Sequence, residues 1–230
     1  NLNFLKKSIW DYMSWFHNQS SIALTPSFNA EKTLIDHGVK RTGIFSRGID
    51  TKHYTPFNRS ETLRKELGIQ DTLALLYVGR VSVEKDLDTL WESYHELKRL
   101  YGDKISLVIT GDGPYLDTCK ENFPKDVIFT GFKTGEELHQ IYASCDIFVC
   151  PSASETFGNV ILEAFASGLA VVGSDQGGVA ELIEDYRNGL KFKAGSSSSL
   201  TQNLIKVIDD KGLRERIIQG ATKTATERSW

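Results

Sequence analysis

The sequence lacks the features typical of membrane-spanning, nucleic-acid-binding and disulfide-stabilised proteins. No apolar run approaches the roughly 18 residues of a membrane-spanning helix, so we predict no transmembrane segment. The formal net charge is −3 and no basic block occurs, which gives nucleic-acid binding no electrostatic support. The three cysteines, Cys119, Cys145 and Cys150, do not have the spacing of metal ligands. We interpret them as core thiols of a protein from a reducing compartment, the cytoplasm.

The signatures of several common enzyme classes are also missing. The five histidines show no ligand spacing, and no serine or cysteine stands in the context of a nucleophile elbow. The stretch from Gly111 to Pro114 follows a predicted strand, but Leu116 stands where a dinucleotide fingerprint has its third glycine. We therefore expect a tight turn at this point and no NAD site.

The apolar pattern predicts strands that alternate with helices. Predicted strands cover residues 22–25, 42–45, 73–78, 105–110, 127–129, 146–150 and 170–174, and helices occupy most of the gaps between them. Such alternation is typical of an α/β fold in which a parallel sheet carries helices on both faces. The length of 230 residues suits one large domain or two small ones.

Two glutamates with seven residues between them, Glu155 and Glu163, follow the predicted strand at 146–150. A helix is predicted to begin near Gly158 and Asn159, so Glu155 lies in the loop and Glu163 in the second helical turn. Both are expected at the carboxyl edge of the sheet, where α/β folds bind ligands. Free N–H groups at the helix start would favour a phosphate. The pattern indicates a phosphorylated sugar or a nucleotide; alternatively, the glutamates only complement the helix dipole.

The loop after the predicted strand at 73–78 is basic. It begins with Gly79, which allows tight backbone geometry, and it contains Arg80 and Lys85. A planar guanidinium and a mobile ammonium are two usual ways of gripping phosphate oxygens, and Glu84 could hold either cation in position. The alternative is a surface pair between Arg80 and Glu84, with Lys85 solvated, which would contribute only about 0.3–0.5 kcal/mol.

Together, these segments resemble the retaining glycosyltransferases of family 4, whose GT-B fold has two Rossmann-like domains that face each other across a cleft. The likeness runs from about Ser20 to Trp230 in the family's order and spacing. The matching residues are Gly79-Arg80 with Glu84-Lys85, Gly111-Asp112-Gly113-Pro114, Gly131-Phe132, Pro151-Ser152 with Glu155-Thr156-Phe157-Gly158, Glu163-Ala164, and Gly177-Gly178 with Glu181. The stretch from Arg47 to Pro56 is similar to the interdomain segment of GDP-mannose-dependent mannosyltransferases and sulfoquinovosyl-type lipid glycosyltransferases.

The resemblance implies transfer of a sugar from a nucleotide diphosphate sugar, GDP-mannose or a UDP-sugar, to an acceptor hydroxyl with retention of configuration. The catalytic groups would be Arg80 and Lys85, which neutralise the departing diphosphate, and Glu155, which binds hydroxyls of the donor sugar. Glu163 would accept hydrogen bonds from the ribose. The other expected donor contacts are Gly79, Gly131, Phe132, Thr156, Phe157, Gly158 and Asn159. We expect no cofactor and no metal ion, because the two cations can take the place of a metal.

By the same resemblance, residues 1–56 would be the end of an N-terminal domain with the interdomain linker, and residues 57–230 a Rossmann-like nucleotide-sugar-binding domain. Both chain ends fall in helical patterns, so we expect part of a longer enzyme, inactive alone, whose other domain completes the site for a sugar or lipid-linked acceptor. The aromatic first helix would pack on that domain or, alternatively, lie at a membrane surface. A nucleotide-sugar epimerase and a non-catalytic binding module are the alternative functions.

Overall fold

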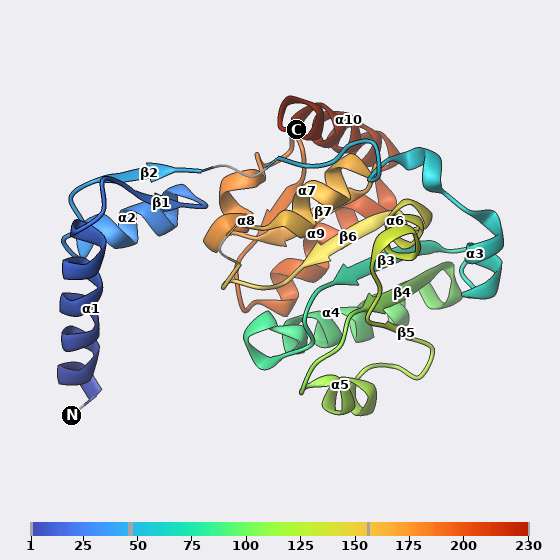
Figure 1. Ribbon diagram of the computed structural model, residues 1–230. Coiled ribbons are helices and arrows are strands. Elements are labelled where there is room, and N and C mark those ends of the chain that lie inside the picture. Colours follow the sequence, from blue (N-terminus) through green and yellow to red (C-terminus); the bar gives the residue numbers. More distant parts are fainter. Residues whose placement is uncertain (1, 46–47, 156, 230) are drawn as a thin grey trace. The chain divides into compact units, whose positions relative to one another are not determined.

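The computed structural model describes residues 2–45, 48–155 and 157–229, with side chains from residue 5 onward (Figure 1). Its internal contacts divide the chain into two compact units, Asn1–Arg47 and Gly48–Trp230. The first unit contains two helices and a two-stranded parallel sheet: α1 (Leu2–Asn18), β1 (Ala23–Thr25), α2 (Phe28–Asp36) and β2 (Thr42–Ile44). Both of its strands were predicted from the sequence.

The second unit is an α/β structure in which strands and helices alternate. Its strands are β3 (Leu73–Val78), β4 (Ile105–Thr110), β5 (Ile128–Gly131), β6 (Ile147–Cys150), β7 (Ala170–Ser174) and β8 (Leu190–Phe192). Its α-helices are α3 (Glu61–Glu66), α4 (Leu87–Tyr101), α5 (Leu116–Asn122), α6 (Gly135–Ser144), α7 (Asn159–Ala166), α8 (Gly177–Leu182), α9 (Ser197–Asp209) and α10 (Lys211–Glu227). Short 3-10 turns occur at η1 (Pro56–Asn58), η2 (Val83–Lys85) and η3 (Gly102–Lys104).

The six strands of the second unit form one parallel sheet in the order β5-β4-β3-β6-β7-β8. The chain therefore runs outward in one direction from β3 and in the opposite direction from β6. The boundary between these two central strands is a topological switch point, which leaves a crevice at the carboxyl ends of the strands. The loops that leave β3 and β6 carry the two motifs that the sequence singled out.

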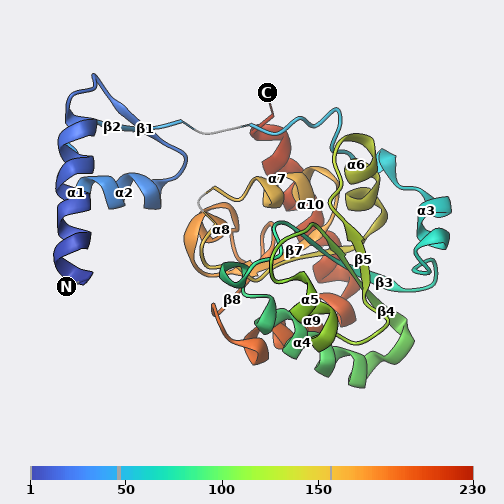
Figure 2. The same ribbon diagram turned by 60° about the horizontal axis from the view of Figure 1, so that its bottom comes forward.

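Helices cover both faces of this sheet (Figure 2). Successive side chains of a strand point to opposite faces, and apolar strand residues on each face pack against helices. Leu75 and Tyr77 belong to a core cluster with residues of α4, α5 and α9. Ala74 and Leu76 point to the other face and share a cluster with α6, α7 and α8. Helix α10 contributes to both clusters. This arrangement confirms the predicted fold class, an α/β fold with a parallel sheet between two helical layers.

The three cysteines are buried and free, as expected of core thiols. Within the described ranges, no helix is both long and apolar enough to cross a bilayer.

Candidate functional site

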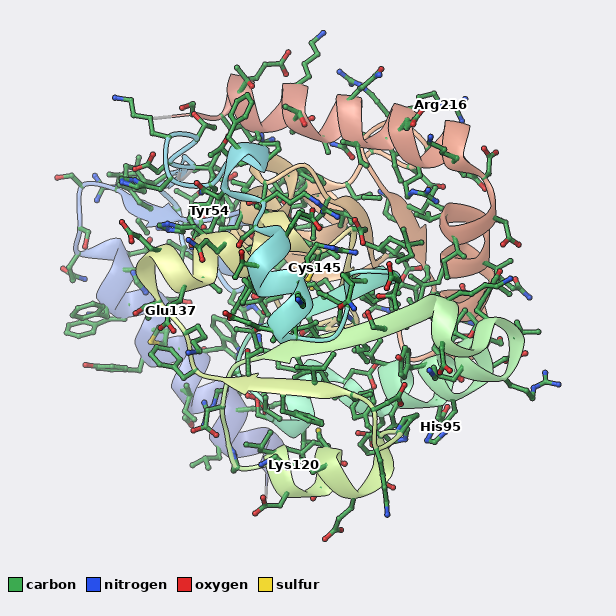
Figure 3. All side chains as sticks on the ribbon, turned by 90° about the vertical axis from the view of Figure 1, so that its right-hand side faces the viewer. Tyr54, His95, Lys120, Glu137, Cys145 and Arg216 are labelled. Atoms are coloured by element: carbon green, nitrogen blue, oxygen red, sulfur yellow. The ribbon has the colours of Figure 1, made fainter. Side chains whose placement is uncertain are left out.

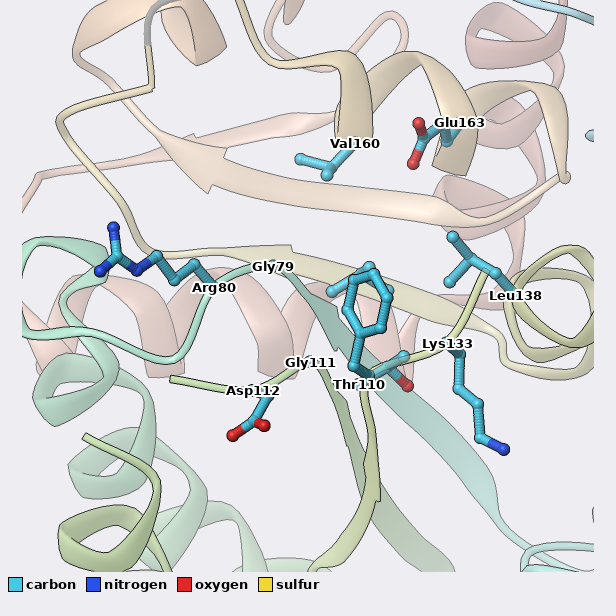
Figure 4. Close-up of a pocket in the computed structure, with 11 residues that line it drawn as sticks. Gly79, Arg80, Thr110, Gly111, Asp112, Lys133, Leu138, Val160 and Glu163 are labelled. Atoms are coloured by element: carbon cyan, nitrogen blue, oxygen red, sulfur yellow. The ribbon is translucent and has the colours of Figure 1, made fainter. Parts of the chain in front are cut away.

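A cavity of about 490 Å³ opens at the carboxyl edge of the sheet (Figure 4). The loops after β3, β4 and β5 form its floor, and α6 and α7 contribute to its wall. Four of the residues predicted for the site line it: Gly79, Arg80, Phe132 and Glu163. The structure thus brings together residues that are up to 84 positions apart in the sequence.

Backbone pairing continues beyond the strand ends and holds the floor loops side by side. The N–H of Gly79 donates to the carbonyl of Thr110 at 3.1 Å, and the N–H of Gly111 donates to the carbonyl of Gly131 at 2.9 Å. Gly111 has a φ of +143°, and a Cβ there would lie 1.9 Å from the carbonyl oxygen of Gly79. Only glycine permits this approach. The contact fixes the loop that carries Arg80.

Arg80 supplies positive charge on one side of the cavity, and Glu163 lies on another side (Figure 4). The Arg80 side chain is exposed, and none of the ion pairs among the described residues involves it. Its carbonyl accepts a hydrogen bond from the Tyr77 hydroxyl at 2.8 Å, which anchors the backbone of this residue. A fixed backbone with a solvent-accessible guanidinium can bind an anion without first breaking an internal ion pair.

Glu163 projects from the second turn of α7 and is held by two phenols. The Tyr142 hydroxyl donates to its carboxylate at 2.8 Å, and the Tyr54 hydroxyl contributes a second, smaller interaction. Burial raises the pKa of Glu163 above its ordinary value, and the two phenols only partly offset this rise. The carboxylate is therefore placed where ligand hydroxyls could stabilise its charged form.

Lys85 and Glu155, which are 70 positions apart, form a half-buried ion pair. Hydroxyls of Ser152 and Ser154 both donate to the carbonyl of Glu84, which ties the loop after β6 to η2. The sequence left open whether Glu84 holds either cation, and in the structure Lys85 has the carboxylate of Glu155 as its partner. Neither member of this pair lines the cavity itself.

The start of α7 lies where the sequence placed it. Gly158 precedes the helix in the left-handed conformation, with a φ of +77°, and Asn159 is the first helical residue. Phe157 is partly buried against the core beneath. The predicted contact Thr156 lies outside the described residues. Gly131 ends β5 beside Phe132, whose side chain is 73% exposed at the cavity.

Two residues of the site, Tyr54 and Tyr142, were not predicted. Tyr142 follows the apolar pattern of α6, and Tyr54 was noticed only as part of the stretch before Pro56, so no sequence signal pairs either hydroxyl with Glu163.

The Asp-Leu-Asp sequence at residues 86–88 begins α4, where the Asp86 carboxylate accepts a hydrogen bond from Thr89. Across the described ranges, no group of three or more His, Cys, Asp or Glu is arranged to hold a metal ion.

Comparison with known proteins identifies related sequences over nearly the whole chain. A family model described as "Glycosyl transferases group 1" matches residues 59–224. The sulfoquinovosyl transferase of Arabidopsis thaliana is 32% identical over 99% of this chain and 46% of its own length. A GDP-mannose-dependent alpha-mannosyltransferase of Corynebacterium glutamicum is 33% identical over 98% of this chain and 53% of its own length. The chain thus spans about half the length of the curated relatives it matches.

Solved structures share the fold. The Anabaena protein HepE, in a crystal structure with UDP and glucose, superposes with a TM-score of 0.87 at 22% identity, covering 100% of this chain and 65% of that one. The C-terminal domain of a group 1 glycosyl transferase family protein from Francisella tularensis gives a TM-score of 0.67 at 28% identity, covering 79% of this chain and 98% of that one.

Proposed function

The chain belongs to the group 1 glycosyl transferases, and from this premise we propose that its second unit binds the nucleotide diphosphate sugar of a hexosyltransferase. The observation that carries the proposal is the cavity at the switch point of the sheet, with a cation, Arg80, and a half-buried carboxylate, Glu163, on its walls. The ribose would lie against Glu163, with the diphosphate directed toward Arg80. The curated relatives are about twice as long, and we expect transfer to need the part of such an enzyme that lies outside this chain.

The charges of the site suit the departure of a diphosphate. Breaking the bond between the sugar and the diphosphate leaves negative charge on the leaving group and oxocarbenium character on the sugar. Arg80 and Lys85 would stabilise the leaving group, as donors already aimed at the developing charge. The start of α7 at Asn159 would add the positive end of the helix dipole. Glu155, held by Lys85, would receive hydroxyls of the donor sugar.

The finer parts of the proposal follow from the same residues and from the relatives. Transfer would retain the anomeric configuration and need no metal ion, because Arg80 and Lys85 would supply the positive charge for the departing diphosphate. The donor would be GDP-mannose or a UDP-sugar, and the acceptor a sugar or a lipid-linked hydroxyl. The buried, free cysteines suit an enzyme that works in the cytoplasm, including at the membrane surface.

Calorimetric titration of the chain with UDP, GDP, ADP, UDP-glucose and GDP-mannose, without metal, tests this function. We expect one base series to bind, and Arg80→Ala to weaken that binding at least tenfold, since a charge-assisted hydrogen bond contributes about 1.5–3 kcal/mol. In the complete enzyme, Arg80→Ala should lower turnover by about 10²–10³.

Arg216→Ala is the matched control, because this exposed arginine lies on α10 and outside the cavity (Figure 3). Its affinity for the same nucleotide should equal that of the wild type. Absence of binding to every nucleotide by both the chain and the complete enzyme would overturn the proposed function, as would equal binding by Arg80→Ala and the wild type.

A further inference from the structure

The carboxylate of Glu163 is approached by two tyrosines from different parts of the second unit. Tyr142 belongs to α6, whereas Tyr54 lies in the segment that precedes η1. The Tyr142 hydroxyl donates at 2.8 Å, and the Tyr54 phenol interacts with the carboxylate more weakly. A carboxylate that lines a cavity and is also held by two phenols can adopt few orientations.

The two phenol rings are themselves fixed by aromatic contacts. Tyr142 is fully buried, and its ring centroid lies 5.7 Å from that of Phe148. The ring of Tyr54 makes T-shaped contacts with those of His139 and Tyr142, at centroid distances of 4.6 Å and 5.6 Å. His53, which pairs with Asp50, stacks on His139 with 5.5 Å between the ring centroids, so His139 is itself held in place. The rings can therefore hold their hydroxyls on Glu163 with little loss of side-chain entropy when a ligand binds.

The hydrogen-bonding capacity of the carboxylate agrees with this arrangement. An ionised carboxylate offers about four acceptor positions. One is used by Tyr142, and Tyr54 interacts with the carboxylate as well, so about two remain fully free for a ligand, which equals the number of hydroxyls on the ribose ring of a nucleotide. Burial raises the pKa of both phenols, so both remain donors over the range in which a glutamate titrates.

We propose that Tyr54 and Tyr142 are positioning residues that aim the free oxygen lone pairs of Glu163 at the two ribose hydroxyls of the donor. The proposal rests on the proposed function for the identity of the ligand. It also gives the segment before η1 a part in donor recognition, although Tyr54 does not line the cavity. The other charged groups near the carboxylate are Arg80, Asp112 and Lys133 on the cavity wall, and His139, His53 and Asp50 behind Tyr54.

A titration of the Glu163 carboxyl carbon by NMR tests whether the phenols hold this group. Removing either hydroxyl with Tyr54→Phe or Tyr142→Phe should raise the pKa of Glu163 further, because each phenol favours the charged form. Tyr101→Phe is the matched control, since its hydroxyl also donates to a carboxylate, that of Asp209 at 2.9 Å, away from the cavity. An unchanged Glu163 titration in both Tyr54→Phe and Tyr142→Phe would overturn the proposal.

Binding of UDP or GDP, whichever the wild type prefers, is then compared with binding of its 2′,3′-dideoxy analogue. The wild type should favour the natural nucleotide, and Tyr54→Phe should reduce this preference by roughly threefold or more, while affinity for the dideoxy analogue stays near the wild-type value. Equal losses for both ligands would indicate a merely structural role and overturn the proposal. A wild type that binds neither ligand, with Glu163 titrating as expected, would instead contradict the proposed function.

Discussion

Replacing Gly111 by alanine tests the close approach of the two loops that form the cavity floor. The new Cβ would lie 1.9 Å from the carbonyl oxygen of Gly79, where ordinary contact begins at 3.4 Å. The loop carrying Arg80 would have to move by about 1.5 Å, and the alanine would also adopt a positive φ of 143°. Overpacking and backbone strain cost about 1–3 kcal/mol each, so we expect the free energy of unfolding to fall by roughly 2–6 kcal/mol.

Urea denaturation and nucleotide calorimetry on the same preparations measure both consequences. Nucleotide affinity should fall at least tenfold, because Arg80 moves with the displaced loop. Gly68→Ala is the matched control: Gly68 also has a positive φ, of 70°, but a Cβ there meets nothing within 4 Å. It should cost only about 1–2 kcal/mol and leave binding unchanged. If Gly111→Ala were no more destabilising than Gly68→Ala and bound nucleotide normally, the reasoning about the floor would be refuted.

Two further predictions concern buried charges. Burial raises the folded-state pKa of Glu163, so its contribution to stability is present at low pH and is lost as the pH rises through that raised pKa. The stability of the wild type relative to Glu163→Gln should therefore fall between about pH 4 and neutrality, as measured by urea titrations; a difference that grows with pH would contradict this sign. Arg64 is 3% exposed and donates to the carbonyls of Ile69 at 2.7 Å and Thr72 at 2.9 Å, besides pairing with Asp146. Arg64→Met should lower the free energy of unfolding by about 3–5 kcal/mol. Arg59 is a more exposed partner of the same aspartate, so Arg59→Met should lower the free energy of unfolding by about 1 kcal/mol or less. Equal losses of stability in the two variants would argue against a buried network around Arg64.

The sequence was sufficient to predict the central strands, because each is a short apolar run bounded by turn residues. β3, β4 and β7 match the predicted residues 73–78, 105–110 and 170–174, and α7 begins at the predicted Asn159. β8 was missed, since its three residues, Leu190–Phe192, include a lysine and are too few to show a period. Its place is set by pairing with β7, which is a tertiary contact.

The candidate site was predicted as a set of residues, but its internal contacts were not. Lys85 and Glu155 were both expected near the donor, yet their pairing depends on the order of β3 and β6 in the sheet. The hydrogen bond from Tyr142 to Glu163 and the weaker interaction of Tyr54 with it likewise depend on how α6 and the segment before η1 pack around α7. Local patterns identify groups with the right chemistry, whereas the partners of buried polar groups are decided by the assembled fold.

A crystal structure of the chain with its preferred nucleoside diphosphate tests whether the cavity at the switch point is the donor site. We expect the nucleotide to occupy this cavity, with its ribose hydroxyls within hydrogen-bonding distance of the Glu163 carboxylate and its diphosphate against Arg80. A nucleotide bound at another place on the second unit, or bound in this cavity with its phosphates at Glu163, would contradict this assignment.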